Sequence, residues 1–208
     1  MSRREVRHLK ANEARRAPWK NGRGVTEELA LWPDGSGFER GDFDWRISKA
    51  AVEEAGAFSI FAGFERVLLV VSGGGLLLDH GEHAPRSRLR PLEPLRFSGD
   101  WPTRCELPQG PIQDFNVLTR RGACDAQVMA VHLGARRLRE MIEAPQAFVH
   151  ALGGALCVRV SGEEQAFELE LGDSLLINAS SSGDELDFLG RHDDTRLILV
   201  RFFKLLVA

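Results

Sequence analysis

Residues 67–78 read VLLVVSGGGLLL and residues 147–158 read AFVHALGGALCV, and these two stretches decide the fold. Each consists of a strand-like apolar run, a pair of glycines and a second strand-like run, which is the pattern of a β-hairpin. The stretches lie 80 residues apart, and laying residue n over residue n+80 needs no gap between residues 67 and 121. We interpret them as matching parts of two copies of one β module.

The match continues beyond the hairpins, where Leu89 falls on Leu169 and Leu95 falls on Leu175. Each copy then reads as strand, glycine turn, strand, polar loop and further strands, which is the order expected of a small antiparallel barrel or jelly roll. In the second copy, residues 172–173 form a Gly-Asp turn that cupin barrels commonly use before a strand. We therefore predict an all-β bicupin fold, with two packed cupin-like barrels of the double-stranded β-helix or jelly-roll type and few short helices.

The repeat also predicts the domain boundaries. We assign residues 1–122 to an N-terminal barrel that carries the pocket motifs and residues 123–208 to a C-terminal barrel, the two forming one compact unit. The segment before Phe43 has no counterpart in the second copy. Alternation and turn residues predict strands at 43–48, 65–71, 75–79, 95–98, 103–107 and 114–120, and helices at 12–16 and 135–143, the second ending before Pro145.

Composition excludes several classes of function. The net charge of -3 comes from 30 acidic and 27 basic side chains mixed along the chain, so no basic stripe predicts nucleic-acid binding. The charged start lacks the apolar run of a signal peptide, and no window approaches the roughly 20 apolar residues of a membrane span. We expect a cytoplasmic protein without a membrane partner. Cys105, Cys124 and Cys157 are odd in number and far apart, which predicts reduced thiols.

One segment combines groups suited to holding a ligand. Residues 18–30 read PWKNGRGVTEELA and lead into a strand-like run. Gly22 and Gly24 allow positive φ and close approach of a ligand to the main chain, while Lys20 and Asn21 supply hydrogen-bond donors at the same bend. We expect this segment to line the functional site; the alternative is a polar turn before a strand.

A second polar segment lies near the end of the first copy. Residues 113–122 read QDFNVLTRRG, and alternation puts Asp114, Asn116 and Arg120 on one face of a strand and Phe115 on the other. In a barrel, one face of each strand looks into the interior. The polar face is therefore directed either into a pocket or toward solvent, and the sequence leaves both open.

Arg46 joins these candidates because it lies in the alternating run FDWRIS at residues 43–48. If Arg46 faces inward, its guanidinium needs a carboxylate partner, which is either Glu28 or a ligand. The predicted pocket has a cationic end formed by Lys20, Arg46 and Arg120 and apolar walls formed by Trp19, Trp45 and Phe115.

No metal or cofactor is predicted. The H-x-H pattern with a following glutamate, typical of metal-binding cupins, is absent, and His80 and His83 form a close pair in a polar loop. The chain has no G-x-S-x-G nucleophile motif, and the glycines at 73–75 lack the Lys-Ser/Thr of a phosphate-binding loop.

The motifs together resemble the HutD/Ves family across essentially the whole chain. The matching blocks are PWKNG at 18–22, GVT at 24–26, FDWRIS at 43–48, FS at 58–59, FSGD at 97–100 and DFNVLTRRG at 114–122. The resemblance implies a bicupin fold without a dedicated metal site and, for the HutD branch, a role in histidine utilisation through binding of urocanate or a formylated glutamate. Two positions depart from the family pattern, Arg23 in place of a third glycine and Glu27 in place of a common arginine.

We therefore expect a non-enzymatic protein that binds a small carboxylate metabolite in the N-terminal barrel and modulates histidine utilisation. The alternatives are a metal-free isomerase or hydrolase with Glu28 and Lys20 as acid and base, a Ves-like stress-response protein, or an interaction module with a vestigial pocket. A homodimer stays open. The predicted ligand-binding residues are Trp19, Lys20, Asn21, Gly22, Gly24, Glu28, Arg46, Phe115, Asn116 and Arg120.

Overall fold

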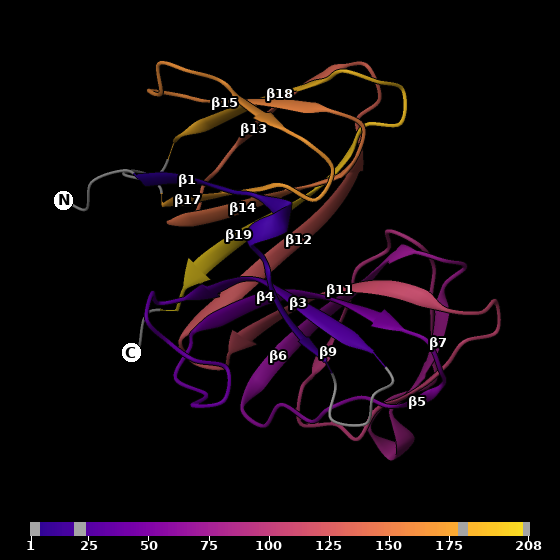
Figure 1. Cartoon of the computed structure of the whole chain (residues 1–208). Coiled ribbons are helices and arrows are strands. Elements are labelled where there is room, and N and C mark those ends of the chain that lie inside the picture. The colour runs from indigo at the N-terminus through magenta and orange to yellow at the C-terminus, as the bar shows by residue number, and fades with distance from the viewer. Residues whose placement is uncertain (1–4, 19–23, 179–182, 206–208) are drawn as a thin grey trace. The chain divides into compact units, whose positions relative to one another are not determined.

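The computed structural model describes residues 5–18, 24–178 and 183–205, and these residues form an almost entirely β structure (Figure 1). The described part contains two single-turn 3₁₀ helices, η1 (Ala11–Glu13) and η2 (Gly81–His83). The chain divides into two compact units, one of residues 15–125 with 205 and the other of residues 5–14 with 126–204. No helix in the described part is both long and apolar enough to cross a membrane.

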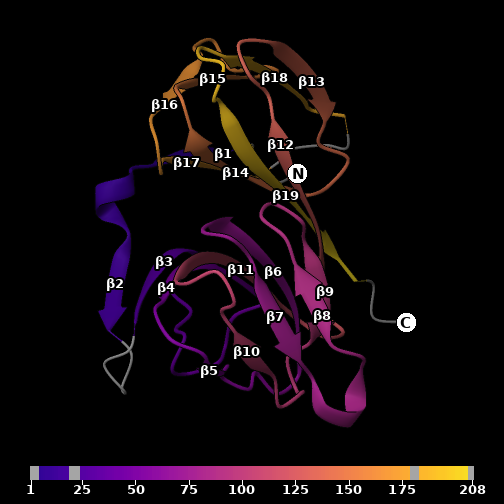
Figure 2. The same ribbon diagram turned by 90° about the vertical axis from the view of Figure 1, so that its right-hand side faces the viewer.

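The unit of residues 15–125 is a barrel of two antiparallel sheets (Figure 2). The larger sheet has the order β2 (Arg15–Pro18), β3 (Val25–Trp32), β4 (Trp45–Val52), β11 (Ile112–Arg120), β6 (Phe64–Ser72) and β9 (Leu95–Ser98). The smaller sheet has the order β5 (Gly56–Ala57), β10 (Arg104–Glu106), β7 (Leu76–Asp79) and β8 (Ser87–Leu89). We call this unit the pocket barrel.

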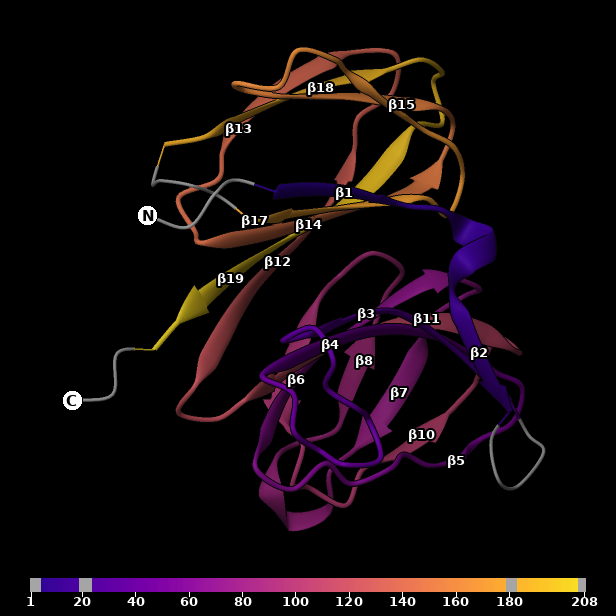
Figure 3. The same cartoon turned by 60° about the vertical axis from the view of Figure 1, so that its left-hand side comes forward.

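The other unit, which we call the packed barrel, also has two sheets. One has the order β1 (Glu5–Leu9), β17 (Ser174–Asn178), β14 (Gln146–Gly153), β19 (Arg196–Lys204) and β12 (Cys124–His132). The second has the order β13 (Arg137–Met141), β18 (Glu185–Gly190), β15 (Leu156–Val160) and β16 (Phe167–Leu169). Figure 3 shows β1 lying along β17, with which it pairs from Glu5 opposite Asn178 to Leu9 opposite Ser174.

The strand orders show that the two barrels are copies of one module. The order β4-β11-β6-β9 in the pocket barrel repeats as β12-β19-β14-β17, and β5-β10-β7-β8 repeats as β13-β18-β15-β16. Both units are cupin-like barrels, so the predicted bicupin fold is confirmed. The segments added to the module are the β2–β3 hairpin in the pocket barrel and β1 in the packed barrel. The sequence-based boundaries assign residues 5–14 to the N-terminal barrel of residues 1–122. In the structure β1 pairs with β17, and residues 5–14 group with residues 126–204.

The constant offset of 80 residues does not hold at the last strand of each copy. In the pocket barrel the pairing register shifts just before Asp114 of β11, and in the packed barrel the corresponding shift lies just before Leu197 of β19. Asp114 therefore corresponds to Leu197 and, two residues later, Asn116 corresponds to Leu199. A β-bulge of this kind is a fixed feature of a strand pair, so it gives a firmer alignment than scattered sequence identities.

Both predicted helices are wrong. Residues 137–141 form β13, which pairs with β18 at five positions, and residues 12–16 are divided between η1 and β2. Local helix propensity is weak, and pairing with a neighbouring strand overrides it. The predicted strand at 95–98 matches β9, and the run at 65–71 lies within β6.

The interiors of the two barrels are filled differently. The packed barrel holds one large apolar cluster that includes Ala147, Val149, Leu197 and Leu199, all at most 1% exposed. Among its described residues, the pocket barrel has two smaller apolar clusters. One is built around Val52, Leu68, Val70, Leu76, Leu78, Leu89, Phe97, Cys105 and Ile112, and the other around Phe43, Phe64 and Leu118. The remaining interior of the pocket barrel contains polar side chains. Cys105 and Cys124 are buried free thiols and Cys157 is a partly buried one.

Candidate functional site

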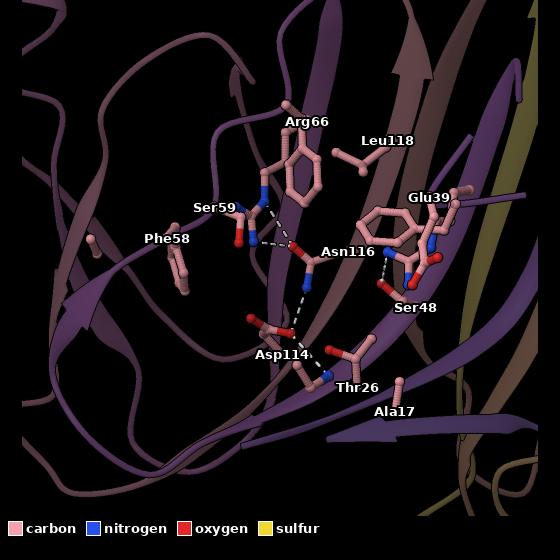
Figure 4. Close-up of a pocket in the computed structure, with 15 residues that line it drawn as sticks. Ala17, Thr26, Glu39, Ser48, Phe58, Ser59, Arg66, Asp114, Asn116 and Leu118 are labelled. Atoms are coloured by element: carbon pink, nitrogen blue, oxygen red, sulfur yellow. Dashed lines mark hydrogen bonds between the residues drawn. The ribbon is translucent and has the colours of Figure 1, made fainter. Parts of the chain in front are cut away.

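A cavity of about 560 Å³ lies in the pocket barrel (Figure 4). Its walls come from β2, β3, β4, β5, β6 and β11 and from the segments that follow β3 and β5. The polar lining consists of Thr26, Glu39, Arg46, Ser48, Ser59, Arg66, Asp114 and Asn116, and the apolar lining of Ala17, Phe38, Ala50, Ala57, Phe58, Phe61 and Leu118. A cavity of this size is typical of a site for a small molecule.

Strand alternation directs the polar side chains inward. On β4, Arg46 and Ser48 line the cavity, while the alternating residues Trp45 and Ile47 are fully buried on the opposite face. On β11, Asn116 lies directly opposite Ser48, so the two side chains share the cavity face. The sequence left open whether this polar face looks inward; Asp114 and Asn116 do line the cavity, whereas Arg120 does not.

Three side chains form a hydrogen-bonded chain on the cavity wall (Figure 4). Arg66 donates through Nε and Nη2 to Oδ1 of Asn116, with the Nε contact at 2.8 Å. Asn116 Nδ2 donates in turn to Oδ1 of Asp114 at 2.5 Å, and the backbone N–H of Ala50 donates to the same oxygen at 3.1 Å. Because both ends of the Asn116 amide are engaged, its orientation is fixed.

Arg66 is a buried cation whose hydrogen-bond acceptor is neutral. Its residue is only 5% exposed, and its guanidinium carbon lies 4.5 Å from the centroid of the Phe58 ring. Burial lowers the pKa of Arg66 to about 10, which leaves the side chain protonated at neutral pH. Among the described residues no carboxylate hydrogen-bonds to this guanidinium, and Nη1 has no partner. An anionic ligand would supply the missing acceptor.

Arg46, in contrast, already has its counter-charge. Its Nε lies 2.8 Å from Glu28 Oε2, Nη1 donates to Ser48 Oγ at 3.2 Å, and the guanidinium carbon lies 4.1 Å from the centroid of the Phe38 ring. Of the two partners that the sequence allowed for Arg46, the structure shows Glu28. The Arg46–Glu28 pair therefore adds little net charge to the cavity.

Asp114 is the buried carboxyl group of the site and is 1% exposed. Burial raises its pKa to about 7, although Arg66 and the hydrogen bonds from Ala50 and Asn116 oppose this rise. Protonated and ionised Asp114 therefore coexist near neutral pH. A perturbed carboxyl in a cavity next to a buried arginine is a typical feature of functional sites.

The structure brings some of the sequence-predicted residues to the cavity and places others elsewhere. Arg46 and Asn116 line it, and Glu28 contacts it through Arg46. Gly24 is described but does not line it. Phe115 is fully buried on the other face of β11. Trp19, Lys20, Asn21 and Gly22 lie outside the described residues, as does Arg23.

Arg120 does not line the cavity but contacts the connection between β3 and β4. Its Nε donates to the carbonyl of Phe43 at 3.0 Å, its Nη2 donates to the carbonyl of Gly41, and its guanidinium carbon lies 4.8 Å from the ring centroid of Phe64. These contacts fix the C-terminal part of the connection between β3 and β4. Phe38 and Glu39, which line the cavity, belong to the same connection.

Two residues predicted for other parts of the pocket also lie off the cavity lining. Trp45, expected as an apolar wall, is fully buried and stacks on Trp32 with ring centroids 6.5 Å apart. Glu27, one of the two departures from the family pattern, pairs with Arg16 at 2.8 Å and with Lys49 at 3.3 Å.

Sequence reasoning missed Arg66 and did not select Asp114, although it had placed Asp114 on the polar face. A signal for Arg66 was present, because it precedes the buried Leu68 and Val70 at spacings of two and four on an apolar strand. A period of two puts an arginine there on the inner face. The loop residues Phe38 and Phe58 carried no such periodic signal.

The described residues contain no group of three histidine, cysteine, aspartate or glutamate side chains that could hold a metal ion. His80, one of the close histidine pair, is buried and lies 2.9 Å from Thr103 Oγ1 through Nδ1, while His83 stacks on Trp101 with ring centroids 5.7 Å apart. These contacts give both histidines structural partners.

Comparison with known sequences matches residues 11–196 to the family model HutD. A Pseudomonas putida protein described as an uncharacterized 21.2 kDa protein in the hutC 3' region is 41% identical over 115 residues, which cover 55% of this chain and 58% of that protein. Protein Ves of Citrobacter koseri is 37% identical over 111 residues, covering 53% of this chain and 56% of Ves. The matched stretch thus spans little more than half the length of these relatives.

Two solved structures cover nearly the whole chain. A conserved protein of unknown function from Pseudomonas aeruginosa PAO1 has a TM-score of 0.84 at 32% identity, with 96% of this chain and 99% of that chain covered. The HutD of Pseudomonas fluorescens SBW25, from a formate condition, has a TM-score of 0.76 at 31% identity and the same coverage.

Proposed function

The chain belongs to the HutD family, and on that premise we propose that its pocket barrel binds a small carboxylate metabolite without transforming it. The observation that carries this proposal is Arg66, a buried and protonated guanidinium whose hydrogen-bond acceptor is the neutral amide of Asn116. A buried cation without a hydrogen-bonded anion is costly in the free protein, and a ligand carboxylate offsets that cost.

The cavity offers both parts of a carboxylate site. A carboxylate at the free guanidinium nitrogen of Arg66 gains a charge-assisted hydrogen bond of about 1.5–3 kcal/mol. The rings of Phe38, Phe58 and Phe61 supply apolar surface for the rest of the ligand, and Thr26 and Ser48 supply hydroxyl groups. Such a combination of a few polar anchors and aromatic walls is typical of small-molecule sites.

The names of the relatives narrow the ligand class. One relative is named for the region beside hutC and one structural neighbour is a HutD, so we propose a carboxylate of histidine utilisation, urocanate or formylglutamate, and a role in modulating that pathway. Urocanate would direct its planar ring toward the phenylalanines, while formylglutamate would direct its second carboxylate toward the rim.

A metal-free isomerase or hydrolase is the second candidate function. The observation in its favour is Asp114, whose pKa of about 7 suits a general acid or base. Glu28, which the sequence suggested for that role, is paired with Arg46 and does not line the cavity. Lys20, its suggested partner, lies outside the described residues.

A thermal-shift panel of urocanate, formylglutamate, histidine, glutamate and formate tests the proposal. A ligand at 100 times its dissociation constant stabilises the protein by about 2.7 kcal/mol, so the melting temperature should rise with ligand concentration. Histidine, whose carboxylate accompanies a cationic amine, serves as the contrast to urocanate. If no member shifts the melting temperature at millimolar concentration, carboxylate binding is wrong.

The same samples distinguish binding from catalysis. Proton NMR spectra recorded over hours should show unchanged ligand signals if the protein only binds. New product signals that disappear in Asp114→Asn would favour the enzyme. New signals that instead disappear in Glu28→Gln would return the catalytic role to Glu28.

A further inference from the structure

Asp114 presents one oxygen atom to the cavity that the protein itself does not use. Oδ1 accepts hydrogen bonds from Ala50 N and Asn116 Nδ2, whereas Oδ2 has no hydrogen-bond partner among the described residues. Figure 4 shows this second oxygen pointing away from Asn116, on the side of the cavity that carries Phe58. The carboxyl group therefore has a fixed orientation and a free atom directed at any ligand.

The same wall carries the free nitrogen of Arg66. Arg66 and Asp114 are linked through the two ends of the Asn116 amide, so the free guanidinium nitrogen and Oδ2 belong to one rigid hydrogen-bonded unit. A ligand carboxylate has two oxygens, and one can accept from Arg66 while the other meets Asp114.

The charges around Asp114 determine what form it takes when the ligand arrives. Arg66 from β6 is the cation that acts on Asp114, and Arg46 from β4 is compensated by Glu28 from β3. On β10, burial raises the pKa of the Cys105 thiol, which is therefore neutral. Glu39, on the β3–β4 connection, is exposed at the cavity.

With Asp114 ionised, a carboxylate entering this site would place two adjacent anions beside one cation, Arg66. With Asp114 protonated, the repulsion disappears and Oδ2–H becomes a hydrogen-bond donor to the ligand. Two carboxyl groups that share one proton in this way are a well-known arrangement.

We propose that the pocket binds its carboxylate together with one proton, which comes from the solvent, resides on Asp114 Oδ2 and is donated in a hydrogen bond to the ligand. This inference rests on the proposed carboxylate binding. It makes Asp114 a specificity-determining residue: the pocket selects a ligand that accepts hydrogen bonds with both carboxylate oxygens, and its affinity follows pH.

Proton linkage has a defined consequence for affinity. The pKa of free Asp114 is about 7, so affinity should be constant below about pH 6 and fall by up to about tenfold per pH unit above about pH 7.5. Affinity falls with rising pH because binding takes up a proton that the free protein has lost at high pH.

Isothermal titration calorimetry with formate between about pH 5.5 and about pH 8.5 tests this linkage, because formate stays ionised throughout that range. Titrations in two buffers with different ionisation enthalpies give the number of protons taken up. We expect about one proton per formate above about pH 8 and about half a proton near pH 7.

Asp114→Asn is the matched variant. Asparagine Oδ1 can accept both existing hydrogen bonds, while its Nδ2–H replaces the Oδ2–H donor, so the variant should bind formate with pH-independent affinity and without proton uptake. Asp125→Asn, which alters an exposed carboxylate of the same unit, should keep the behaviour of the wild type. Persisting pH dependence in Asp114→Asn would overturn the assignment of the proton.

A measurement on the wild-type chain makes the test independent of variant folding. The carboxyl ¹³C resonance of Asp114 should titrate near pH 7 in the free protein and at higher pH when formate saturates the site. Formate binding with constant affinity and an unchanged Asp114 titration would overturn the proton linkage alone. Absence of formate binding at every pH, together with a silent ligand panel, would overturn carboxylate binding and the linkage with it.

Discussion

The pocket barrel and the packed barrel have the same strand order but different interiors. Asp114 and Asn116 of the pocket barrel correspond to Leu197 and Leu199 of the packed barrel, which are fully buried in an apolar cluster. The scaffold therefore does not require polar residues at these positions. Polar groups that the scaffold does not need, and that cost stability when buried, are best explained by a ligand.

The charged side chains of the two barrels show the same contrast. In the packed barrel, Arg201 is bound to Glu140 at 2.7 Å and Asp173 accepts from Lys10 at 2.9 Å, so both have partners of opposite charge. In the pocket barrel, Arg66 and Asp114 are both joined to Asn116, a neutral residue. Arg201 and Asp173 thus contact a group of opposite charge directly, whereas Arg66 and Asp114 are joined only through a neutral amide.

The largest expected effect comes from making the packed barrel resemble the pocket barrel. Leu199→Asn places an amide in an apolar cluster that offers it no partner. The lost apolar burial and the unsatisfied amide together should lower the free energy of unfolding by about 4 kcal/mol. Urea denaturation monitored by circular dichroism measures the change.

Leu199→Met is the control for this variant, because it keeps an apolar side chain of similar volume and should cost less than about 1.5 kcal/mol. Equal stability of the two variants would show that the packed barrel tolerates polar groups as well as the pocket barrel does. The contrast between the interiors would then carry no functional meaning.

A pair of arginine variants should separate binding from stability. Arg66→Met removes the cation that we propose holds the ligand, so carboxylate affinity should fall by about 10- to 100-fold while stability changes little. Arg201→Met leaves Glu140 without its cation and should lower the free energy of unfolding by about 1–3 kcal/mol without changing affinity. Calorimetric titration and urea denaturation of both variants measure the two quantities.

The opposite pattern would contradict the assignment. If Arg201→Met weakened binding as much as Arg66→Met, the site would not be specific to the pocket barrel. If Arg66→Met were as destabilising as Arg201→Met, Arg66 would be a structural residue.

Two of the buried aspartates, Asp173 and Asp114, should give stability changes of opposite sign. Asp173 has its pKa lowered to about 2 by hydrogen bonds from Lys10, Ala11 and His8, which outweigh its burial. Its contribution, about 2 kcal/mol, is present at neutral pH and is lost as pH falls from about 4 to about 2. Asp173→Asn should therefore lower stability at neutral pH by about that amount.

For Asp114 the sign is reversed, because its folded pKa is raised to about 7. Its contribution to stability is fully present below about pH 4 and is lost as pH rises through about 7. Asp114→Asn should therefore be more stable than the wild type at about pH 8 and lose this advantage at about pH 4. Denaturation at both pH values tests the sign; a destabilised Asp114→Asn at high pH would mean that the ionised group is stabilised after all.

The smallest expected effect concerns the aromatic wall. Phe58→Leu removes the ring that lies 4.5 Å from the Arg66 guanidinium and should weaken carboxylate binding by about two- to fivefold. Phe167→Leu is the matched change in the packed barrel and should leave affinity unchanged. Thermal-shift titrations resolve the difference, and an unchanged affinity in Phe58→Leu would remove this ring from the site.

The sequence predicted the parts of the site that follow strand periodicity. Arg46 and Asn116 were identified because alternation assigns side chains to one face of a strand, and the repeat identified the two barrels. Phe38 and Phe58 lie on connections between strands, where no period links sequence position to direction. Their positions depend on contacts with residues distant in the sequence, such as the hydrogen bond from Arg120 to the carbonyl of Phe43 in the β3–β4 connection.

The errors have physical causes as well. Residues 137–141 look helical locally, but pairing with β18 makes them a strand. The overlay at a constant offset missed the correspondence of Asp114 with Leu197, since these two positions lie 83 residues apart and the overlay used an offset of 80. The contrast between the polar interior of the pocket barrel and the apolar interior of the packed barrel is seen only when the two copies are aligned by strand register.

The most direct test of the central claim is a ¹⁵N NMR titration of the wild-type chain with the carboxylate that gives the largest thermal shift. The account predicts that the Nε–H signal of Arg66 and the side-chain amide signals of Asn116 shift saturably, while the amide signals of β14, β15, β17 and β19 stay in place. Saturable shifts confined to the packed barrel, with Arg66 and Asn116 unmoved, would contradict it.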